Sequence, residues 1–131
     1  MFGKSAATSP AKSEARPNRI DSLIGPGTTV EGNIRFVGGL RIEGEIKGDV
    51  NVDPSESGVL MLGNSGVING NVRVSHLVVD GTINGNVYVS EAIELSPTAR
   101  IFGDIEYGGL EMHMGATVQG SLKPMAKASQ E

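Results

Sequence analysis

The fold is decided by residues 68–87, INGNVRVSHLVVDGTINGNV, in which the five-residue unit INGNV occurs twice, 15 residues apart. Each unit begins and ends with a large apolar side chain and has a glycine at its centre. Similar units recur along the chain at intervals of 16, 22, 15, 18 and 17 residues. The six units are Val30–Ile34, Ile46–Val50, Ile68–Val72, Ile83–Val87, Ile101–Ile105 and Val118–Leu122. A nearly fixed period of this kind is typical of a repeat architecture.

Apolar and polar residues alternate within each repeat, which is the period of a β-strand. A second apolar pair follows each of the first five units on the same alternation, for example Leu77/Val79 and Ile93/Leu95. Strands this short are not stable alone, so each repeat must place its strands on those of the repeat before it. The sequence therefore predicts an all-β fold, a right-handed parallel β-helix of about six turns with columns of Val, Ile and Leu inside.

The left-handed β-helix of hexapeptide acyltransferases is the alternative solenoid. Its apolar residue at every sixth position matches Ile24, Val30, Phe36 and Ile42 but fails at Gly48. A hexapeptide acyltransferase would also need a regular six-residue period and a catalytic histidine in a cleft between subunits. Unequal turns and a turn-like insertion at residues 53–58 favour the right-handed form.

The central glycine of each unit marks a corner of the coil. A sharp bend there leaves no room for a β-carbon or needs a positive φ angle. These structural glycines are Gly32, Gly48, Gly70, Gly85, Gly103 and Gly120. The next position holds Asn33, Asp49, Asn71, Asn86, Asp104 and Ser121. Asn and Asp tolerate such bends, and we expect stacked Asn side chains to pair along a ladder.

Composition and charge divide the 131-residue chain into three parts. Residues 1–19 carry a net charge of +3, residues 20–122 a net charge of −8, and residues 123–131 a charge of +1. We expect a disordered basic tail over 1–19, one β-helical domain over 20–122 and a disordered tail over 123–131. The acidic domain would repel nucleic acid. Without a membrane-spanning run or a secretory signal, we expect a soluble, cytoplasmic protein.

The two ends of such a coil expose unpaired strand edges and an apolar cross-section, which solenoids normally cover with polar caps. Neither tail offers an amphipathic helix or an apolar segment that could act as a lid. The predicted end contacts are Ile20, Leu23 and Ile24 in the first turn and Val118 and Leu122 in the last. The sequence therefore predicts end-to-end self-assembly.

The chain opens with Met1, Phe2, Gly3 and Lys4. An aromatic side chain next to a cation makes a weak membrane-targeting peptide, since each basic residue near an anionic surface contributes about 1 kcal/mol. One copy of this peptide would bind a membrane only weakly. Many copies along a filament would bind an anionic membrane surface by avidity.

The six units and the two short, proline-containing tails resemble the bactofilins, a family of bacterial cytoskeletal proteins, over residues 20–123. The resemblance implies a three-sided, right-handed parallel β-helix that polymerises without nucleotide into non-polar filaments, in which like ends meet. It also implies scaffolding of cell-wall and morphogenesis factors, among them peptidoglycan hydrolases, at the inner face of the membrane. Many members carry a phenylalanine in the C-terminal turn that supports polymerisation, and Val118 stands at that place here. The start of the chain is similar to the family's membrane-targeting peptide.

Catalytic, cofactor and metal chemistry have little support. Zero Cys and two His leave no ordinary zinc cluster and no cysteine nucleophile. Ser75 and His76 are adjacent in a predicted strand and point to opposite faces, so they cannot form a triad with Asp80. His113 is predicted to face outward, and Gly25-Pro26-Gly27 lacks the helix of a phosphate-binding loop. We expect no enzyme activity and no cofactor.

The alternative function is a non-polymerising binding module that recruits partner proteins through its faces. One outward column on successive turns would suit it: Arg35, Arg73, Tyr88 and Glu106.

Overall fold

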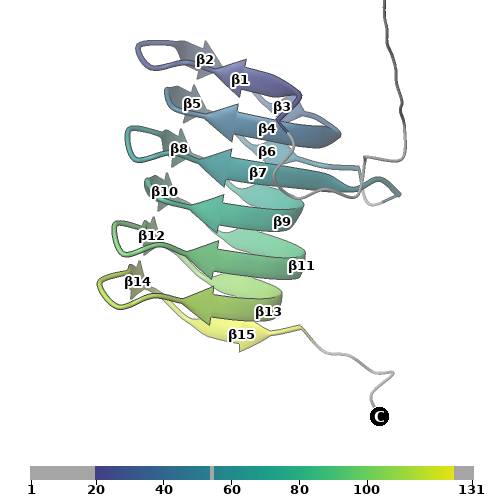
Figure 1. The fold of residues 1–131 in the computed structure, drawn as a ribbon. Coiled ribbons are helices and arrows are strands. Elements are labelled where there is room, and N and C mark those ends of the chain that lie inside the picture. The colour runs from purple at the N-terminus through teal and green to yellow at the C-terminus, as the bar shows by residue number, and fades with distance from the viewer. Residues whose placement is uncertain (1–19, 54, 126–131) are drawn as a thin grey trace, which may run out of the picture.

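The computed structural model describes residues 20–53 and 55–125, and every helix or strand assigned in that part of the chain is a β-strand. All strand pairs are parallel. Figure 1 shows the strands stacked as a coil from β1 at one end to β15 at the other. The strands are β1 (Ser22–Ile24), β2 (Thr29–Glu31), β3 (Ile34–Arg35), β4 (Gly38–Ile42), β5 (Glu45–Lys47), β6 (Val50–Asn51), β7 (Gly58–Leu62), β8 (Val67–Asn69), β9 (Val72–Val79), β10 (Thr82–Asn84), β11 (Val87–Leu95), β12 (Arg100–Phe102), β13 (Ile105–Met112), β14 (Thr117–Gln119) and β15 (Leu122–Pro124).

The coil has three faces. Face A is the six-stranded sheet of β2, β5, β8, β10, β12 and β14, one strand for each of six turns. The long strands bend around a corner, since the start of β9 pairs with β6 and its end pairs with β7. Face B therefore contains β3, β6, the first halves of β9, β11 and β13, and β15. Face C contains β1, β4, β7 and the second halves of β9, β11 and β13. The predicted all-β parallel solenoid is confirmed.

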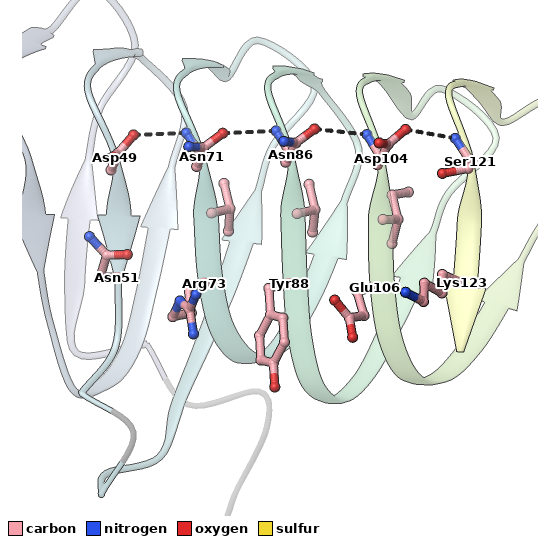
Figure 2. A pocket seen from close by; sticks show the side chains of 13 residues that line it. Asp49, Asn51, Asn71, Arg73, Asn86, Tyr88, Asp104, Glu106, Ser121 and Lys123 are labelled. Carbon is pink, nitrogen blue, oxygen red and sulfur yellow. Dashed lines mark hydrogen bonds between the residues drawn. The ribbon is translucent and has the colours of Figure 1, made fainter. Parts of the chain in front are cut away.

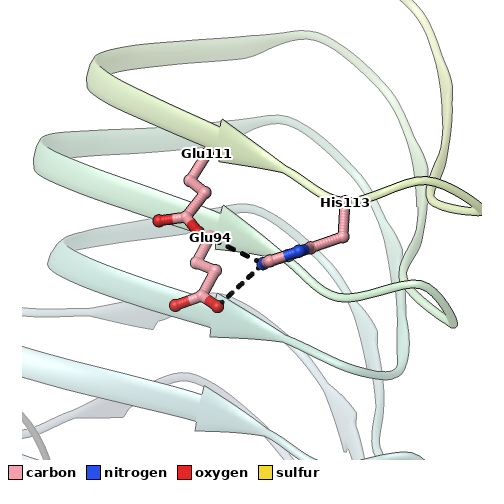
Figure 3. Close-up of side chains that lie close together, drawn as sticks. All are labelled: Glu94, Glu111 and His113. Atoms are coloured by element: carbon pink, nitrogen blue, oxygen red, sulfur yellow. Dashed lines mark hydrogen bonds and ion pairs between the residues drawn. The ribbon is translucent and has the colours of Figure 1, made fainter.

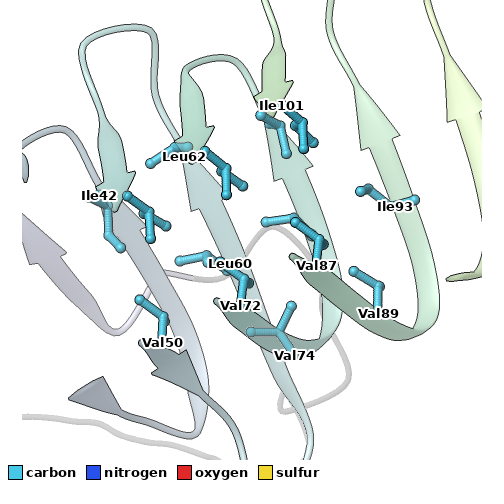
Figure 4. Packing of buried hydrophobic residues seen from close by; sticks show 14 of the residues in the cluster. Ile42, Val50, Leu60, Leu62, Val72, Val74, Val87, Val89, Ile93 and Ile101 are labelled. Atoms are coloured by element: carbon cyan, nitrogen blue, oxygen red, sulfur yellow. The ribbon is translucent and has the colours of Figure 1, made fainter. Parts of the chain in front are cut away.

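The core consists of the predicted apolar columns. The register aligns the first residues of the six units on the inside of face A. Ile46, Ile68, Ile83 and Ile101 of this column are fully buried. Faces B and C contribute further columns, and Figure 4 shows their side chains packed inside the coil. Each middle turn is thus covered on both sides by its neighbours.

The central glycines lie at the corner between faces A and B, where successive turns touch through their backbones. A β-carbon on Gly85 would lie 2.1 Å from the carbonyl oxygen of Gly70, and φ at Gly85 is +158°. Gly32, in the first turn, has φ of +128° but nothing within 4 Å of its β-carbon position. The close approach therefore arises only where one turn is stacked on another.

A ladder of hydrogen bonds follows this corner, but its chemistry differs from the prediction. Each Asn or Asp side chain accepts a hydrogen bond from the backbone N–H of the corresponding residue in the next turn, at 2.9–3.0 Å (Figure 2). The side chains do not pair with one another because the nearer donor is the stacked backbone. Amide pairing occurs instead on the outside of face A, where Asn84 Nδ2 donates to Asn69 Oδ1 at 2.8 Å.

The insertion at residues 53–58 lies at the corner between faces B and C. Ser75, a buried polar residue in the next turn, satisfies the backbone where the insertion rejoins the coil at β7. Its Oγ accepts from the N–H of Gly58 at 2.7 Å and donates to the carbonyl of the same residue at 3.0 Å. Within the insertion, a hydrogen bond from the backbone N–H of Ser55 lowers the pKa of Asp53.

Candidate functional site: the two ends and two outer faces

The N-terminal end of the coil exposes apolar side chains that the following turns bury. Within the described residues, strands β1, β2 and β3 each have a parallel neighbour on one side only. The inward residues of this turn are only partly buried and are Ile24, Val30, Ile34 and Phe36. The residues stacked on the first three, Ile42, Ile46 and Val50, are each 0% exposed. This end is therefore an open apolar cross-section bordered by unpaired strand edges.

As far as residue 125, where the description of the chain ends, the C-terminal end is open in the same way. Val118 and Leu122 continue the columns of Ile101 and Ile105. Ile101 and Ile105 are 0% and 1% exposed, whereas Leu122 is 40% exposed. Met112 and Met114 add further exposed apolar surface in this last turn. An apolar end that lacks a polar cap favours contact with another apolar end.

The structure separates the predicted end residues into two groups. Ile24, Val118 and Leu122 occupy inward columns at the two ends, and Ile20 lies just before β1. Leu23 does not point into the cross-section: it pairs with Arg41 on the outside of face C and is 61% exposed. The physical reason is the alternation of the strand, because Ile24 takes the inward position. The prediction of the end contacts omitted five other inward residues, which could have been found from their places in the repeat columns. They are Val30, Ile34, Phe36, Leu110 and Met112. Met1, Phe2, Gly3 and Lys4 lie outside the described residues.

Face B carries the predicted outward column, with two more members. Asn51 lies between Arg35 and Arg73, and Lys123 follows Glu106 in the last turn. A hollow of about 690 Å³ lies along this column and the corner ladder (Figure 2). The Arg73 guanidinium stacks 4.7 Å from the centre of the Tyr88 ring. The face thus combines one aromatic ring with charges of both signs.

A cluster of two carboxylates and one imidazole lies at the C-terminal end of face C (Figure 3). His113 Nε2 is 3.1 Å from Glu94 Oε2 and 3.3 Å from Glu111 Oε2. These three side chains could approach a cation together, but all are well exposed and they already pair with one another. Sequence reasoning missed this cluster, although Glu94 and Glu111 occupy one column in consecutive turns.

Ser75 and His76 show no catalytic arrangement. Ser75 Oγ is engaged with the backbone of Gly58. His76 faces the outside of face C, where its Nδ1 is buried and has no hydrogen-bond partner among residues 20–53 and 55–125. The two side chains therefore lie on opposite sides of strand β9.

The sequence model of one family matches residues 22–123, nearly the whole described coil, under the description "Bactofilin: Polymer-forming cytoskeletal". The chain belongs to the bactofilin family. It is 28% identical over 108 residues to bactofilin BacP of Myxococcus xanthus (strain DK1622), which covers 82% of this chain and 43% of BacP. It is 26% identical over 102 residues to bactofilin BacO of the same organism, which covers 78% of each chain. No solved structure matches the chain significantly.

Membership of this family makes the chain a polymer-forming cytoskeletal protein. The chain spans less than half the length of BacP. Across residues 20–53 and 55–125, no helix has the length and apolar character needed to cross a bilayer.

Proposed function

We propose that this bactofilin assembles end to end, without nucleotide, into non-polar filaments at the inner face of the cell membrane. The filaments would scaffold cell-wall and morphogenesis factors, among them peptidoglycan hydrolases. In this role the protein needs no catalytic activity of its own. The observation that carries the proposal is the pair of open apolar ends.

End contacts would bury what single subunits leave exposed. Leu122 is 40% and Met112 is 42% exposed at one end, and Ile20 is 39% exposed at the other. Burying one large aliphatic side chain contributes about 1.5–3 kcal/mol, and the edge strands gain backbone hydrogen bonds. A contact between two copies of the same end is self-complementary under a twofold axis. Alternation of the two like-end contacts then gives a filament without polarity.

Assembly without nucleotide is supported by the architecture of the described residues. Phosphate-binding loops place backbone N–H groups and a helix N-terminus against the phosphates. The described part of the coil consists of strands and turns, with no helix to provide such a site. The free energy of assembly would therefore come from the ends alone.

Membrane contact is the part of the proposal that rests on the N-terminal segment. Phe2 offers a small apolar anchor, and the nearby Lys4 offers positive charge. Each such contact is weak, and the filament would multiply it.

The end contact is tested by Val118→Arg, with Thr117→Arg as the matched control. Val118 points inward in the last turn, whereas its neighbour Thr117 is exposed on the outside of the same strand. We expect Val118→Arg to place an unpaired charge in the contact and to release short oligomers in sedimentation velocity. Thr117→Arg should sediment like the unmodified protein. Equal sedimentation of all three proteins would contradict the proposal.

A second candidate is the non-polymerising binding module, favoured by the Arg73–Tyr88 stack on face B. Such a module would use face B to recruit a partner protein. A single monomer or dimer boundary at micromolar concentration would support this alternative over filament assembly.

A further inference from the structure

The outside of face C has an unusual distribution of side chains along the coil. In the two outward columns of this face the middle turns present mostly small or apolar residues, while the carboxylates lie in the last two turns. The two outward columns are Leu23, Arg41, Met61, Val78, Glu94 and Glu111, and Gly39, Val59, His76, Ala92 and Gly109. The only Lys or Arg in these columns is Arg41, which is paired with Glu43 at 2.6 Å.

A shallow hollow lies in this face where its side chains are smallest. Ala92 and Gly109 stack in consecutive turns and leave a space of about 330 Å³. His76 lines the space, and its buried Nδ1 has no hydrogen-bond partner in the part of the chain that the structure describes. Glu94 and Glu111 also line it, and one oxygen of each already lies within 3.3 Å of His113 Nε2, which leaves the second oxygen of each for another partner. The hollow thus offers an apolar floor, one unused polar nitrogen and a negative side, which suits an extended peptide that carries cations.

The chain itself provides a segment with that chemistry. Residues 1–19 carry four basic side chains and one acidic side chain, against the net −8 of residues 20–122. Face B is a poorer partner for a basic segment, because it presents Arg35, Arg73 and Lys123. Charge complementarity therefore favours face C.

The position where the described chain begins also favours face C. The backbone N–H of Asp21 donates to the carbonyl of Gly39 at 2.9 Å, so the chain enters β1 at the corner where face C starts. Lys12 lies eight positions before Ile20, which allows a reach of about 26 Å. Five steps between six turns at about 4.8 Å each make about 24 Å. Lys12 can therefore reach the acidic end of its own coil.

We propose that residues 1–19 dock as an extended segment along face C of their own domain. Lys12 lies against Glu94 and Glu111, and the neighbouring small residues of the segment cover Ala92. Arg16 lies nearer the middle of the face. This intramolecular contact goes beyond filament assembly and does not depend on it.

Disulfide trapping in the full-length chain tests the docking, since the natural sequence has no cysteine. One variant carries Ala11→Cys with Ala92→Cys on face C. The control carries Ala11→Cys with Asn51→Cys on face B, in a turn closer to the start of the coil. We expect at least tenfold faster intramolecular cross-linking in the first pair at low salt. Glu94→Gln with Glu111→Gln should remove that difference.

The readout is the rate of monomeric cross-linked product on a non-reducing gel, with circular dichroism to verify that each variant is folded. Equal rates for the two pairs would overturn the proposal. An unchanged rate for the Ala11→Cys and Ala92→Cys pair after the two glutamate substitutions would also overturn it. Cross-linked dimers in place of cross-linked monomers would also overturn it, because the segment would then contact another subunit. Filament assembly is measured separately by sedimentation, so its failure is distinguishable.

Discussion

Gly85→Ala is the substitution whose cost can be worked out most fully from the structure, with Gly32→Ala as its matched control. Both glycines have a φ angle that L side chains rarely adopt, +158° and +128°. At Gly85 the new β-carbon would also lie 2.1 Å from the carbonyl oxygen of Gly70, a backbone atom that cannot move aside as a side chain would. At Gly32 it would meet nothing within 4 Å.

The two variants therefore share the cost of the unusual φ and differ in the contact with the preceding turn. The unusual φ costs about 1–3 kcal/mol at either position. Overpacking against the preceding turn costs a further 1–3 kcal/mol or so at Gly85. Separating the turns would also stretch the hydrogen bond from the Asn86 N–H to Asn71 Oδ1, now 3.0 Å. We expect Gly85→Ala to lose about 2–6 kcal/mol, a large share of the usual 5–15 kcal/mol for a domain.

The assay is urea unfolding followed by far-UV circular dichroism, with all proteins at one concentration because self-assembly adds to apparent stability. Gly85→Ala should have the lowest midpoint, and Gly32→Ala should lie between it and the unmodified protein. Equal midpoints for the two variants would refute the explanation by close approach of stacked turns.

Three further predictions concern the insertion corner, the ladder and the N-terminal segment. Ser75→Ala leaves the buried backbone N–H of Gly58 without its acceptor and should cost about 1–3 kcal/mol in urea unfolding, whereas Ala at exposed Ser90 should be neutral. The Ser121 N–H lowers the pKa of Asp104; this folded pKa is below the unfolded one, so its stabilisation is complete above the ordinary value and is lost as pH falls through the folded value. As the pH is lowered, the urea midpoint should fall less for Asp104→Asn than for the unmodified protein. An equal fall would contradict a stabilising role for the Asp104 carboxylate in the ladder. Phe2→Ala should reduce co-sedimentation with anionic vesicles while filaments persist, and unchanged co-sedimentation would exclude the anchor.

The repeated units were sufficient to predict the core, because each unit marks the same inward positions in every turn. Ile46, Ile68, Ile83 and Ile101 follow from that pattern and are fully buried. Leu23 was misplaced because the first turn lacks the apolar pair of later turns: Ser22 occupies the column of Leu40. With only one apolar neighbour to set the alternation, the sequence left the direction of Leu23 open.

The surface clusters were harder to predict because they depend on the register between turns. Strand β11 shifts register between Val89 and Ala92 against both neighbours. The alignment of Glu94 with Glu111 depends on this irregularity at the corner between faces B and C. The ladder chemistry was also missed, since the pattern of Asn and Asp does not show whether an amide or a backbone N–H will be the donor.

Electron microscopy of the purified full-length protein, without nucleotide or added metal, tests the central claim most directly. Two open apolar ends predict filaments that lengthen with protein concentration and show no polarity when averaged. Isolated particles the length of one or two coils at micromolar concentration would contradict the account.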